Sequence, residues 1–334
     1  MKKNFSLKSF NTFNLDVKAD YFFEFSNENE IIEVLKNEKF RNLKHLILGG
    51  GSNILFLRNF KGLVLYNQIK GIEILEKNNE NIILKVGAGE NFDDFIAYCV
   101  ENNFYGLENL SGIYGSVGAT VIQNVGAYGV EIKDFIKKVI VIEKENLSKK
   151  TINKQELNFS YRESIFKNEK KDKFIITYII ISLKIKKIFN SNYGNLKKVF
   201  EELSDLNLKN IRKSILKIRN NKLPDPKIFG NVGSFFKNPI IPLKKLEFIR
   251  NKKIEIPYFK MDENFVKIPS AYLIENCGLK EKRFKNCGIY EKHNLIIINY
   301  GNSNGKEILE FAKKIKKKVL KKFDIKLVEE VNIY

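Results

Sequence analysis

Tryptophan is absent from this chain of 334 residues, and it has only six prolines, three cysteines, two histidines and two methionines. The cysteines are Cys99, Cys277 and Cys287, and the histidines are His45 and His293. They are the residues that could form disulfides or bind zinc. No zinc pattern can be assembled from so few widely spaced residues. Because the cysteines are odd in number and dispersed, they indicate a reducing compartment rather than a disulfide framework.

Long hydrophobic runs are also missing. The longest apolar run, Phe174 to Leu183, is closed by a lysine at each end and is too short to span a bilayer, so it predicts a buried β-strand. The start Met-Lys-Lys is followed by no apolar stretch before Asn11, which argues against a signal peptide. We therefore expect a cytoplasmic protein that does not enter a membrane.

What is present is typical of a globular protein. Hydrophobic residues make up 43% of the chain and charged residues 29%. The length suits two or three domains. Since tryptophan is absent, 27 phenylalanines and 14 tyrosines must supply the aromatic part of the core.

The net charge of +20 raises the possibility of nucleic-acid binding. The most basic stretch, Lys313 to Lys322, lies in a segment where apolar residues recur every three or four positions. These residues are Ile308, Phe311, Ile315, Val319 and Phe323. The spacing predicts an amphipathic helix with a solvated lysine face, which also permits a diffuse attraction for phosphates. A nucleic-acid-binding protein would need aromatic residues on a basic sheet or a docking helix, and the sequence shows neither.

Hydrophobic periodicity predicts strands and short helices in the first two-thirds of the chain. The strands are expected at 45–48, 82–86, 139–143 and 174–183, and the helices at 30–37 and 91–101. A helix-rich stretch over 196–220 ends at Leu223-Pro224-Asp225-Pro226, where the prolines predict a domain boundary. A smaller α+β unit should follow, with helices at 270–276 and 306–323 and strands at 295–299 and 326–334.

The turn Gly49-Gly50-Gly51-Ser52-Asn53 follows one of the predicted strands. Glycines let the backbone approach a ligand closely, and successive N–H groups can surround phosphate oxygens. A purely structural turn would need one or two glycines rather than three. The turn therefore predicts a phosphate-binding site.

Two other glycine segments fall short of known nucleotide motifs. The segment Gly301 to Lys306 resembles a P-loop, but its glycines are one residue too close and Glu307 stands where serine or threonine is required. Gly87-Ala88-Gly89 lacks the third glycine of the dinucleotide fingerprint, because Phe92 occupies that place. A P-loop nucleoside triphosphatase and a Rossmann dehydrogenase are both disfavoured.

The segment Leu110 to Gly129 contains five glycines and several small residues. Such a composition favours neither helix nor strand, and a loop of this length is uncommon without a function. Its backbone is expected to lie against something large and planar or anionic. A flavin with its pyrophosphate fits this description, although a merely tortuous loop is the alternative.

The same segment resembles the flavin-binding loop of the MurB family, the UDP-N-acetylenolpyruvoylglucosamine reductases. Further similar motifs follow in the family's order: 161–167 (Tyr-Arg-Glu-Ser-Ile-Phe-Lys), 222–227 (Lys-Leu-Pro-Asp-Pro-Lys), 230–239 (Gly-Asn-Val-Gly-Ser-Phe-Phe-Lys-Asn-Pro) and 329–331 (Glu-Glu-Val). The resemblance extends from about Asn11 to the end of the chain. Tyr193-Gly194 resembles the family's longer form, in which a tyrosine loop closes over the substrate.

The resemblance implies an α+β protein with a two-part, vanillyl-alcohol-oxidase-like FAD-binding fold and a smaller α+β substrate-binding domain. The expected divisions are residues 1–72 with 324–334, then 73–223, then 224–323. The implied enzyme reduces the enol ether of its UDP-sugar substrate in peptidoglycan precursor synthesis, with non-covalent FAD as cofactor and NADPH as reductant. It is expected to be a monomer without a nucleic-acid partner.

The resemblance also implies roles for individual residues. Ser234 would donate a proton, while Arg162 and Glu330 would stabilise the enolate. A serine is a weak acid, so it needs that charge to be stabilised already. The implied FAD contacts are Gly49, Gly50, Gly51, Ser52, Asn53, Ser111, Gly112, Gly115, Ser116, Gly118, Ala119, Ile122 and Gly126. The implied substrate contacts are Tyr128, Tyr193, Arg219, Lys222, Asn238 and His293, of which His293 could instead be a strand-edge residue.

The chain departs from the family's pattern in three places. Tyr114 and Val121 stand where the family usually has proline, and the C-terminal acid lacks its usual flanking proline and arginine. Glu329 therefore competes with Glu330, since neighbours in a strand point to opposite faces. The alternative function is another FAD oxidoreductase of the same fold that acts on an alcohol or hydroxy acid.

Overall fold

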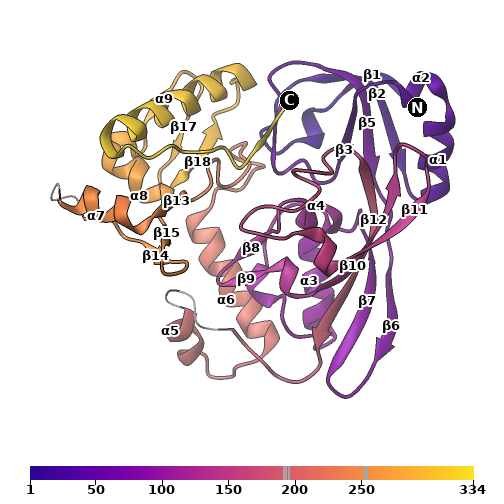
Figure 1. The fold of residues 1–334 in the computed structure, drawn as a ribbon, viewed down its shortest axis with the longest axis horizontal. Coiled ribbons are helices and arrows are strands. Elements are labelled where there is room, and N and C mark those ends of the chain that lie inside the picture. The colour runs from indigo at the N-terminus through magenta and orange to yellow at the C-terminus, as the bar shows by residue number, and fades with distance from the viewer. Residues whose placement is uncertain (191–193, 195, 252–254) are drawn as a thin grey trace. The chain divides into compact units, whose positions relative to one another are not determined.

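The computed structural model describes residues 1–190, 194, 196–251 and 255–334. The chain forms two compact units, each built from several stretches of sequence (Figure 1). The first unit contains Met1–Phe5, Ala19–Gly51 and Phe60–Arg219; the second contains Ser6–Lys18, Ser52–Asn59 and Asn220–Tyr334. The last stretch of the second unit begins close to the predicted boundary at Pro224.

The first unit begins with a four-stranded sheet of order β1-β2-β5-β3. Its strands are β1 (Lys2–Ser6), β2 (Lys18–Phe25), β3 (His45–Leu48) and β5 (Phe60–Asn67). Strands β2, β5 and β3 run parallel. Helices α1 (Glu28–Lys36) and α2 (Glu38–Arg41) precede β3, and Ile31 and Leu35 of α1 are buried in one cluster with Leu63 and Leu65 of β5. This packing fixes β3, whose end carries the predicted phosphate turn.

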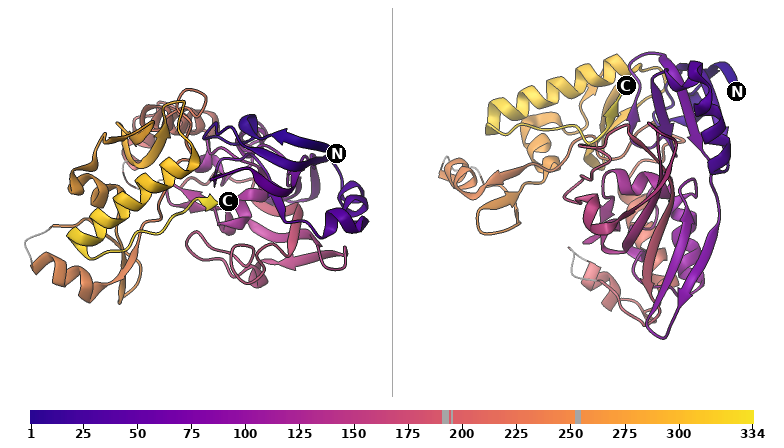
Figure 2. Two further views of the ribbon diagram at one scale, coloured as in Figure 1. Left: turned by 90° about the horizontal axis from the view of Figure 1, so that it is seen from above. Right: turned by 45° about the vertical axis from the view of Figure 1, so that its right-hand side comes forward.

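The larger sheet of the first unit is antiparallel and has five strands in the order β11-β10-β12-β7-β6. Its strands are labelled in Figure 1, and Figure 2 shows the same ribbon from two further sides. Its strands are β6 (Ile72–Lys77), β7 (Asn81–Gly87), β10 (Ile136–Glu143), β11 (Lys149–Asn153) and β12 (Phe174–Lys184). Alternate residues Ile82, Leu84 and Val86 of β7 are buried in one cluster with residues of α3 (Phe92–Glu101) and α4 (Val117–Ile122). The alternation gives the sheet one buried face, as expected for an antiparallel sheet.

The helix-rich stretch predicted over 196–220 is confirmed as two helices, α5 (Leu196–Glu201) and α6 (Leu208–Lys222). Leu196 and Phe200 of α5 share a buried cluster with Ile211 and Ile215 of α6. Tyr193, predicted to contact substrate, lies outside the described residues.

The second unit is the predicted smaller α+β part. It contains sheets of order β13-β15-β14 and β16-β17-β18 and a short parallel pair of β4 with β19. The strands are β4 (Ile54–Leu55), β13 (Ile240–Pro242), β14 (Phe259–Lys260), β15 (Phe265–Lys267), β16 (Arg283–Phe284), β17 (Cys287–Tyr290), β18 (His293–Asn299) and β19 (Asn332–Ile333). The helices are α7 (Leu243–Asn251), α8 (Ser270–Ile274), which continues into a π-helical turn, and α9 (Gly305–Phe323).

Helix α9 confirms the amphipathic prediction. All five residues on the predicted apolar stripe, Ile308 to Phe323, are buried, and most of the lysines between them are exposed. Asn304 caps the helix, since its side chain accepts a hydrogen bond from the Glu307 N–H at 3.0 Å. The concentrated positive charge is thus the solvated face of a packed helix.

Two predictions about local structure are wrong. The glycine-rich segment contains α4 and the two-residue strand β8 (Gly126–Ala127), because Val117 and Val121 are buried in the core and Gly118 packs against Ala88. The expected long C-terminal strand is reduced to β19. Residues before it form isolated hydrogen bonds instead of a ladder: Lys237 N–H donates to the Val328 carbonyl and Glu330 N–H to the Phe235 carbonyl, each at 2.9 Å.

Among the described residues, no helix combines the length and apolarity needed to cross a membrane. The same part of the chain shows no group of three or more His, Cys, Asp or Glu side chains arranged to hold a metal ion. All three cysteines are free thiols.

Candidate functional site

The two glycine segments singled out in the sequence meet in the first unit. A Cβ on Gly49 would lie 2.2 Å from the Ser116 hydroxyl oxygen, and one on Gly50 would lie 2.7 Å from the Gly115 Cα. The two backbones are therefore closer than any side chain permits. Gly49–Gly51 follow the carboxyl end of a parallel strand, which is where open α/β sheets bind their ligands.

Each of the two glycine segments has a backbone N–H group that is available to a ligand. Among the described residues, no partner is found for the N–H of Gly50 or of Gly115. Gly51 and Gly115 have φ values of 63° and 135°, which orient the backbone in ways that residues with a Cβ rarely adopt. The paired turns can thus present main-chain N–H groups to an anionic or planar ligand.

Side chains around the glycine-rich segment hold its backbone in place. The Ser111 hydroxyl donates to the Glu108 carbonyl at 2.6 Å, and the Ser164 hydroxyl donates to the Ile122 carbonyl at 2.7 Å. Of the other predicted FAD contacts here, Ser116 and Gly118 are buried and Ala119 is exposed. These hydrogen bonds hold the backbone of the segment, while part of its surface remains accessible.

Arg162 also contacts this segment. Its Nη2 donates to the Gly126 carbonyl at 2.8 Å and its Nη1 approaches the Asn124 carbonyl at 3.4 Å. Its own backbone has a φ of 59°, which is uncommon for a residue other than glycine and directs the side chain to these carbonyls. The structure thus brings the predicted catalytic arginine onto the predicted flavin loop.

Arg219 of α6 lies beside the same loop. A Cβ on Gly112 would be 3.1 Å from its Nε, a buried atom without a hydrogen-bond partner in the described structure. Burial lowers the pKa of Arg219, and a hydrogen bond with Tyr128 opposes that effect. Tyr128 and Arg219, both predicted to line the substrate site, are therefore neighbours.

The second unit brings three further predicted residues together through the backbone. The Glu330 N–H donates to the carbonyl of Phe235, the residue after Ser234, at 2.9 Å. The Asn53 side chain donates to the Glu330 carbonyl at 3.3 Å. Ser234 in turn pairs with Ile296 of β18, so the serine turn, the C-terminal segment and Asn53 form one local arrangement.

One of the two candidate acids, Glu329, forms an ion pair with a lysine of α9. Both carboxylate oxygens of Glu329 lie 2.8 Å from Nζ of Lys316 on α9, and the Glu329 side chain is 19% exposed. This ion pair commits Glu329 to α9.

Three of the remaining predicted substrate contacts lie in the second unit. Lys222 is the last residue of α6 and is exposed. The Asn238 side-chain oxygen accepts from the Ser270 N–H at 2.9 Å. His293 is the first residue of β18, and its Nδ1 accepts from the Leu295 N–H at 3.3 Å, which gives it a local role at the strand end.

Sequence reasoning missed two charged residues beside the glycine-rich segment. Asp93 and Arg212 form an ion pair with atoms 2.6 Å apart, and Asp93 also accepts a hydrogen bond from the Gly112 N–H. They are separated by 119 positions in the chain. No sequence pattern linked them, because each taken alone is an ordinary charged residue on a helix.

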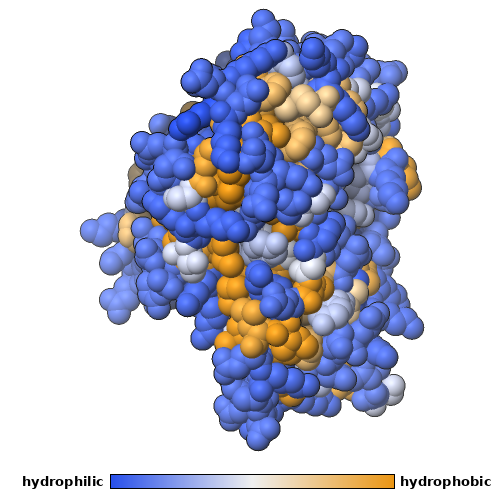
Figure 3. Space-filling view, turned by 90° about the vertical axis from the view of Figure 1, so that its right-hand side faces the viewer, coloured by the Kyte–Doolittle hydropathy of each residue, from blue (hydrophilic) through white to orange (hydrophobic). Residues whose placement is uncertain are grey.

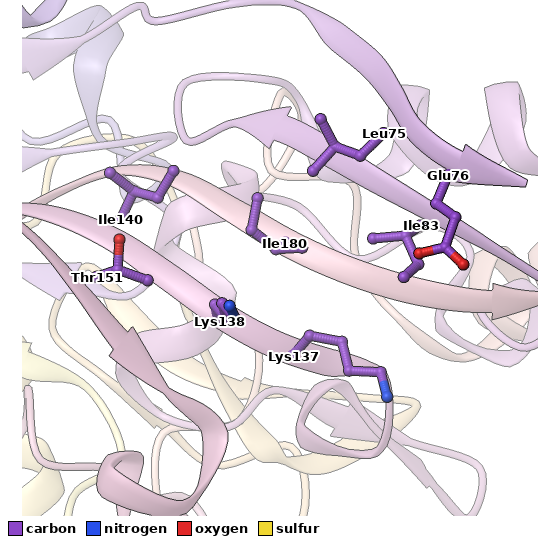
Figure 4. Close-up of a pocket in the computed structure, with 8 residues that line it drawn as sticks. All are labelled: Leu75, Glu76, Ile83, Lys137, Lys138, Ile140, Thr151 and Ile180. Carbon is purple, nitrogen blue, oxygen red and sulfur yellow. The ribbon is translucent and has the colours of Figure 1, made fainter.

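A groove of about 500 Å³ lies elsewhere in the first unit, on the outer face of the five-stranded sheet. Figure 4 shows Ile140, Ile180 and Ile83 on neighbouring strands, with Lys138 on one side and Glu76 on the other. On the side of the molecule where this sheet lies, apolar side chains emerge among polar ones (Figure 3). None of the predicted site residues lines this groove.

Two family models match the chain. Residues 19–145 match an FAD-binding domain, and residues 225–334 match the C-terminal domain of UDP-N-acetylenolpyruvoylglucosamine reductase. The first match contains both glycine segments, and the second contains Ser234, Asn238 and Glu330. The chain therefore contains an FAD-binding domain followed by a reductase C-terminal domain, which confirms the expected fold class.

Individual relatives agree with these matches. The UDP-N-acetylenolpyruvoylglucosamine reductase of Flavobacterium johnsoniae is 43% identical over 100% of this chain and 99% of that protein. The enzyme of the same name from Bacteroides fragilis is 36% identical over 99% of each chain. The crystal structure of MurB from Thermus caldophilus has the same fold, with a TM-score of 0.68 at 19% identity over 98% of this chain and 97% of that one. By its two domain matches and its full-length identity to these relatives, the chain belongs to the UDP-N-acetylenolpyruvoylglucosamine reductase family.

Proposed function

We propose that this protein is an FAD-dependent oxidoreductase that uses NADPH to reduce UDP-N-acetylenolpyruvoylglucosamine to UDP-N-acetylmuramate, a step of peptidoglycan precursor synthesis. The observation that carries the proposal is the meeting of Gly49 and Gly50 with Gly115 and Ser116 inside the matched FAD-binding domain. Two glycine-lined backbones with available N–H groups suit a flavin and its pyrophosphate.

The residues present fit FAD. Gly49–Asn53 supply the first binding turn, and the second segment supplies Ser111, Gly112, Gly115, Ser116, Gly118, Ala119, Ile122 and Gly126. No cysteine or histidine lies in that segment, so the cofactor is held without a covalent bond. When bound, FAD supplies hydride transfer from NADPH to the substrate.

The chain's own residues then complete the reaction. In this proposal the Ser234 hydroxyl donates a proton to the substrate carbon next to the carboxylate. Arg162 contributes a fixed positive charge that stabilises the developing enolate. Glu330 supports the same charge and must therefore hold a proton.

Substrate binding is assigned to six residues. In the proposal, Tyr128 and Arg219 line the cleft near the flavin and the substrate carboxylate. Tyr193, Lys222, Asn238 and His293 contact the diphosphate and the sugar. The His293 ring also accepts a hydrogen bond from the Leu295 N–H near the start of β18.

The proposal also covers the domain organisation, the location and the oligomeric state of the enzyme. We assign residues 1–72 with 324–334 and 73–223 to the two FAD-binding subdomains and 224–323 to substrate binding. We expect a cytoplasmic monomer that binds neither nucleic acid nor membrane. Light scattering of the purified protein measures the oligomeric state.

Absorbance and half-reactions of the purified protein test the function. The protein should carry or take up FAD, and under anaerobic conditions NADPH should bleach the flavin. Adding UDP-N-acetylenolpyruvoylglucosamine should then restore its absorbance. A colourless protein that takes up no FAD contradicts the proposal. Bleaching by an alcohol or hydroxy acid but not by NADPH would instead support the alternative oxidoreductase.

A further inference from the structure

The Asp93–Arg212 pair joins two helices of the first unit. Asp93 lies in the first turn of α3 and Arg212 lies in α6. Arg212 Nη1 is 2.6 Å from Asp93 Oδ1 and Nη2 is 2.9 Å from Oδ2. The side chains are only 16% and 29% exposed. This is the two-point geometry in which an arginine–carboxylate pair is strongest.

The same carboxylate also holds the glycine-rich segment. The Gly112 N–H donates to Asp93 Oδ1 at 2.5 Å, so one oxygen accepts from both the loop and Arg212. Burial opposes the charge on Asp93, but the hydrogen bonds from Arg212 and Gly112 and the nearby arginines outweigh it, so its pKa lies below the ordinary value. The loop therefore depends on a charged acceptor.

Helix α6 also packs closely against the same glycine. A Cβ on Gly112 would lie 2.9 Å from Leu216 Cδ2 and 3.1 Å from Arg219 Nε, and Gly112 has a φ of 76°. Arg212, Leu216 and Arg219 are spaced four and three positions apart, so they share one face of the helix. One helix face thus contacts Asp93 and the glycine turn, and it also carries the predicted substrate arginine.

We propose that Asp93 and Arg212 are positioning residues that fix the Gly112 turn for FAD and, through α6, the place of Arg219. The inference rests on the proposed function and adds two residues to it. Asp93 acts through the loop and not on the reacting atoms. Because a single carboxylate oxygen serves both partners, the position requires an acceptor at residue 93 and not merely opposite charges at 93 and 212.

Three variants test this assignment. Asp93→Asn keeps the shape but weakens both hydrogen bonds, and Arg212→Lys keeps the charge but loses the planar fork. Each should raise the Kd for FAD about 10-fold or more, the scale of a lost hydrogen bond to a charged group. Each should also change the visible circular dichroism of the bound flavin. Glu33→Gln, which removes an exposed pair with Lys36, is the matched control and should change neither.

A charge swap gives the sharpest outcome. In the double variant Asp93→Arg with Arg212→Asp, a purely structural ion pair would be restored, and the Kd for FAD would return to the wild-type value. We expect no such recovery, since arginine cannot accept from the Gly112 N–H. Wild-type Kd and flavin spectrum in D93N, or recovery in the swap, would overturn the inference. A wild-type protein that takes up no FAD would instead overturn the proposed function on which it rests.

Discussion

The two units contain different kinds of candidate residues. In the first unit, the candidate cofactor site consists mainly of glycines whose backbones touch. Side chains such as Ser164 hold the glycine-rich segment by hydrogen bonds to its carbonyls. In the second unit, the candidate residues are Ser234, Asn238, Glu330 and other side chains presented by short segments. In the proposed function, the first unit therefore recognises FAD through main-chain shape, while the second supplies groups that change protonation.

Replacing Ser234 with alanine tests this division most strongly. If the second unit supplies the proton, reoxidation of the reduced flavin by substrate should slow by about 10²–10⁴-fold, the usual effect of a lost general acid. Bleaching by NADPH should stay nearly unchanged. Stopped-flow absorbance resolves the two half-reactions. Equal loss in both would assign Ser234 a structural role.

The neighbouring glutamates provide an internal comparison within the second unit. Glu330→Gln should lower the rate of the substrate half-reaction by about 10²–10³-fold, as expected when a group stabilising transition-state charge is lost. Glu329→Gln should leave that rate unchanged and cost at most about 1 kcal/mol of stability, because it loses only the pair with Lys316. The reverse result would make Glu329 the catalytic acid.

In the first unit, Gly50→Ala should act on binding and not on proton transfer. The new Cβ would meet backbone at 2.7 Å, and the resulting overpacking of about 1–3 kcal/mol corresponds to a rise of about 5–150-fold in the Kd for FAD. Isothermal titration with FAD measures this. Gly278→Asn is the control, since Gly278 has a left-handed conformation that asparagine tolerates and no atom within 4 Å of a new Cβ. Unchanged FAD binding in G50A would remove the main support for the glycine site.

The smallest effect is expected for His45 on β3, the strand that precedes the Gly49–Gly51 turn. Burial lowers the pKa of His45 on β3, although its hydrogen bond to the Phe40 carbonyl opposes the shift. The folded state thus favours the neutral ring, so stability should be lost as the pH falls below 6.5 towards the folded pKa. His45→Gln, neutral throughout, should flatten this part of the stability profile in urea titrations. A profile identical to wild type would show that His45 contributes nothing to it.

Local patterns predicted much of the fold. Strand β3 and helices α3 and α9 were located to within one residue, since their apolar periodicity coincides with clear start and stop signals. The C-terminal segment was predicted as a long strand because its apolar alternation is real. Its backbone instead forms isolated hydrogen bonds with residues 235 and 237 and with the Asn53 side chain. Whether an extended segment forms a ladder depends on a distant partner, which local sequence does not specify.

The candidate site was predictable where glycines or family motifs marked it. Gly49–Gly51 and the segment around Gly115 were found separately, but nothing in the sequence showed that they touch. Asp93 and Arg212 were missed for a related reason, since their importance lies in a shared contact with Gly112. Residues that act through such contacts become visible only when the chain is folded.

The exposed lysine face of α9 has a consequence for kinetics. Lys313, Lys317, Lys318 and Lys321 are exposed, while the apolar face of the helix maintains the packing. Their charges can therefore change with little effect on folding. The field they produce attracts polyanions over roughly 10 Å at 0.1 M ionic strength. Capture of a diphosphate-bearing ligand should consequently slow as salt rises, even where every contact in the bound complex stays the same.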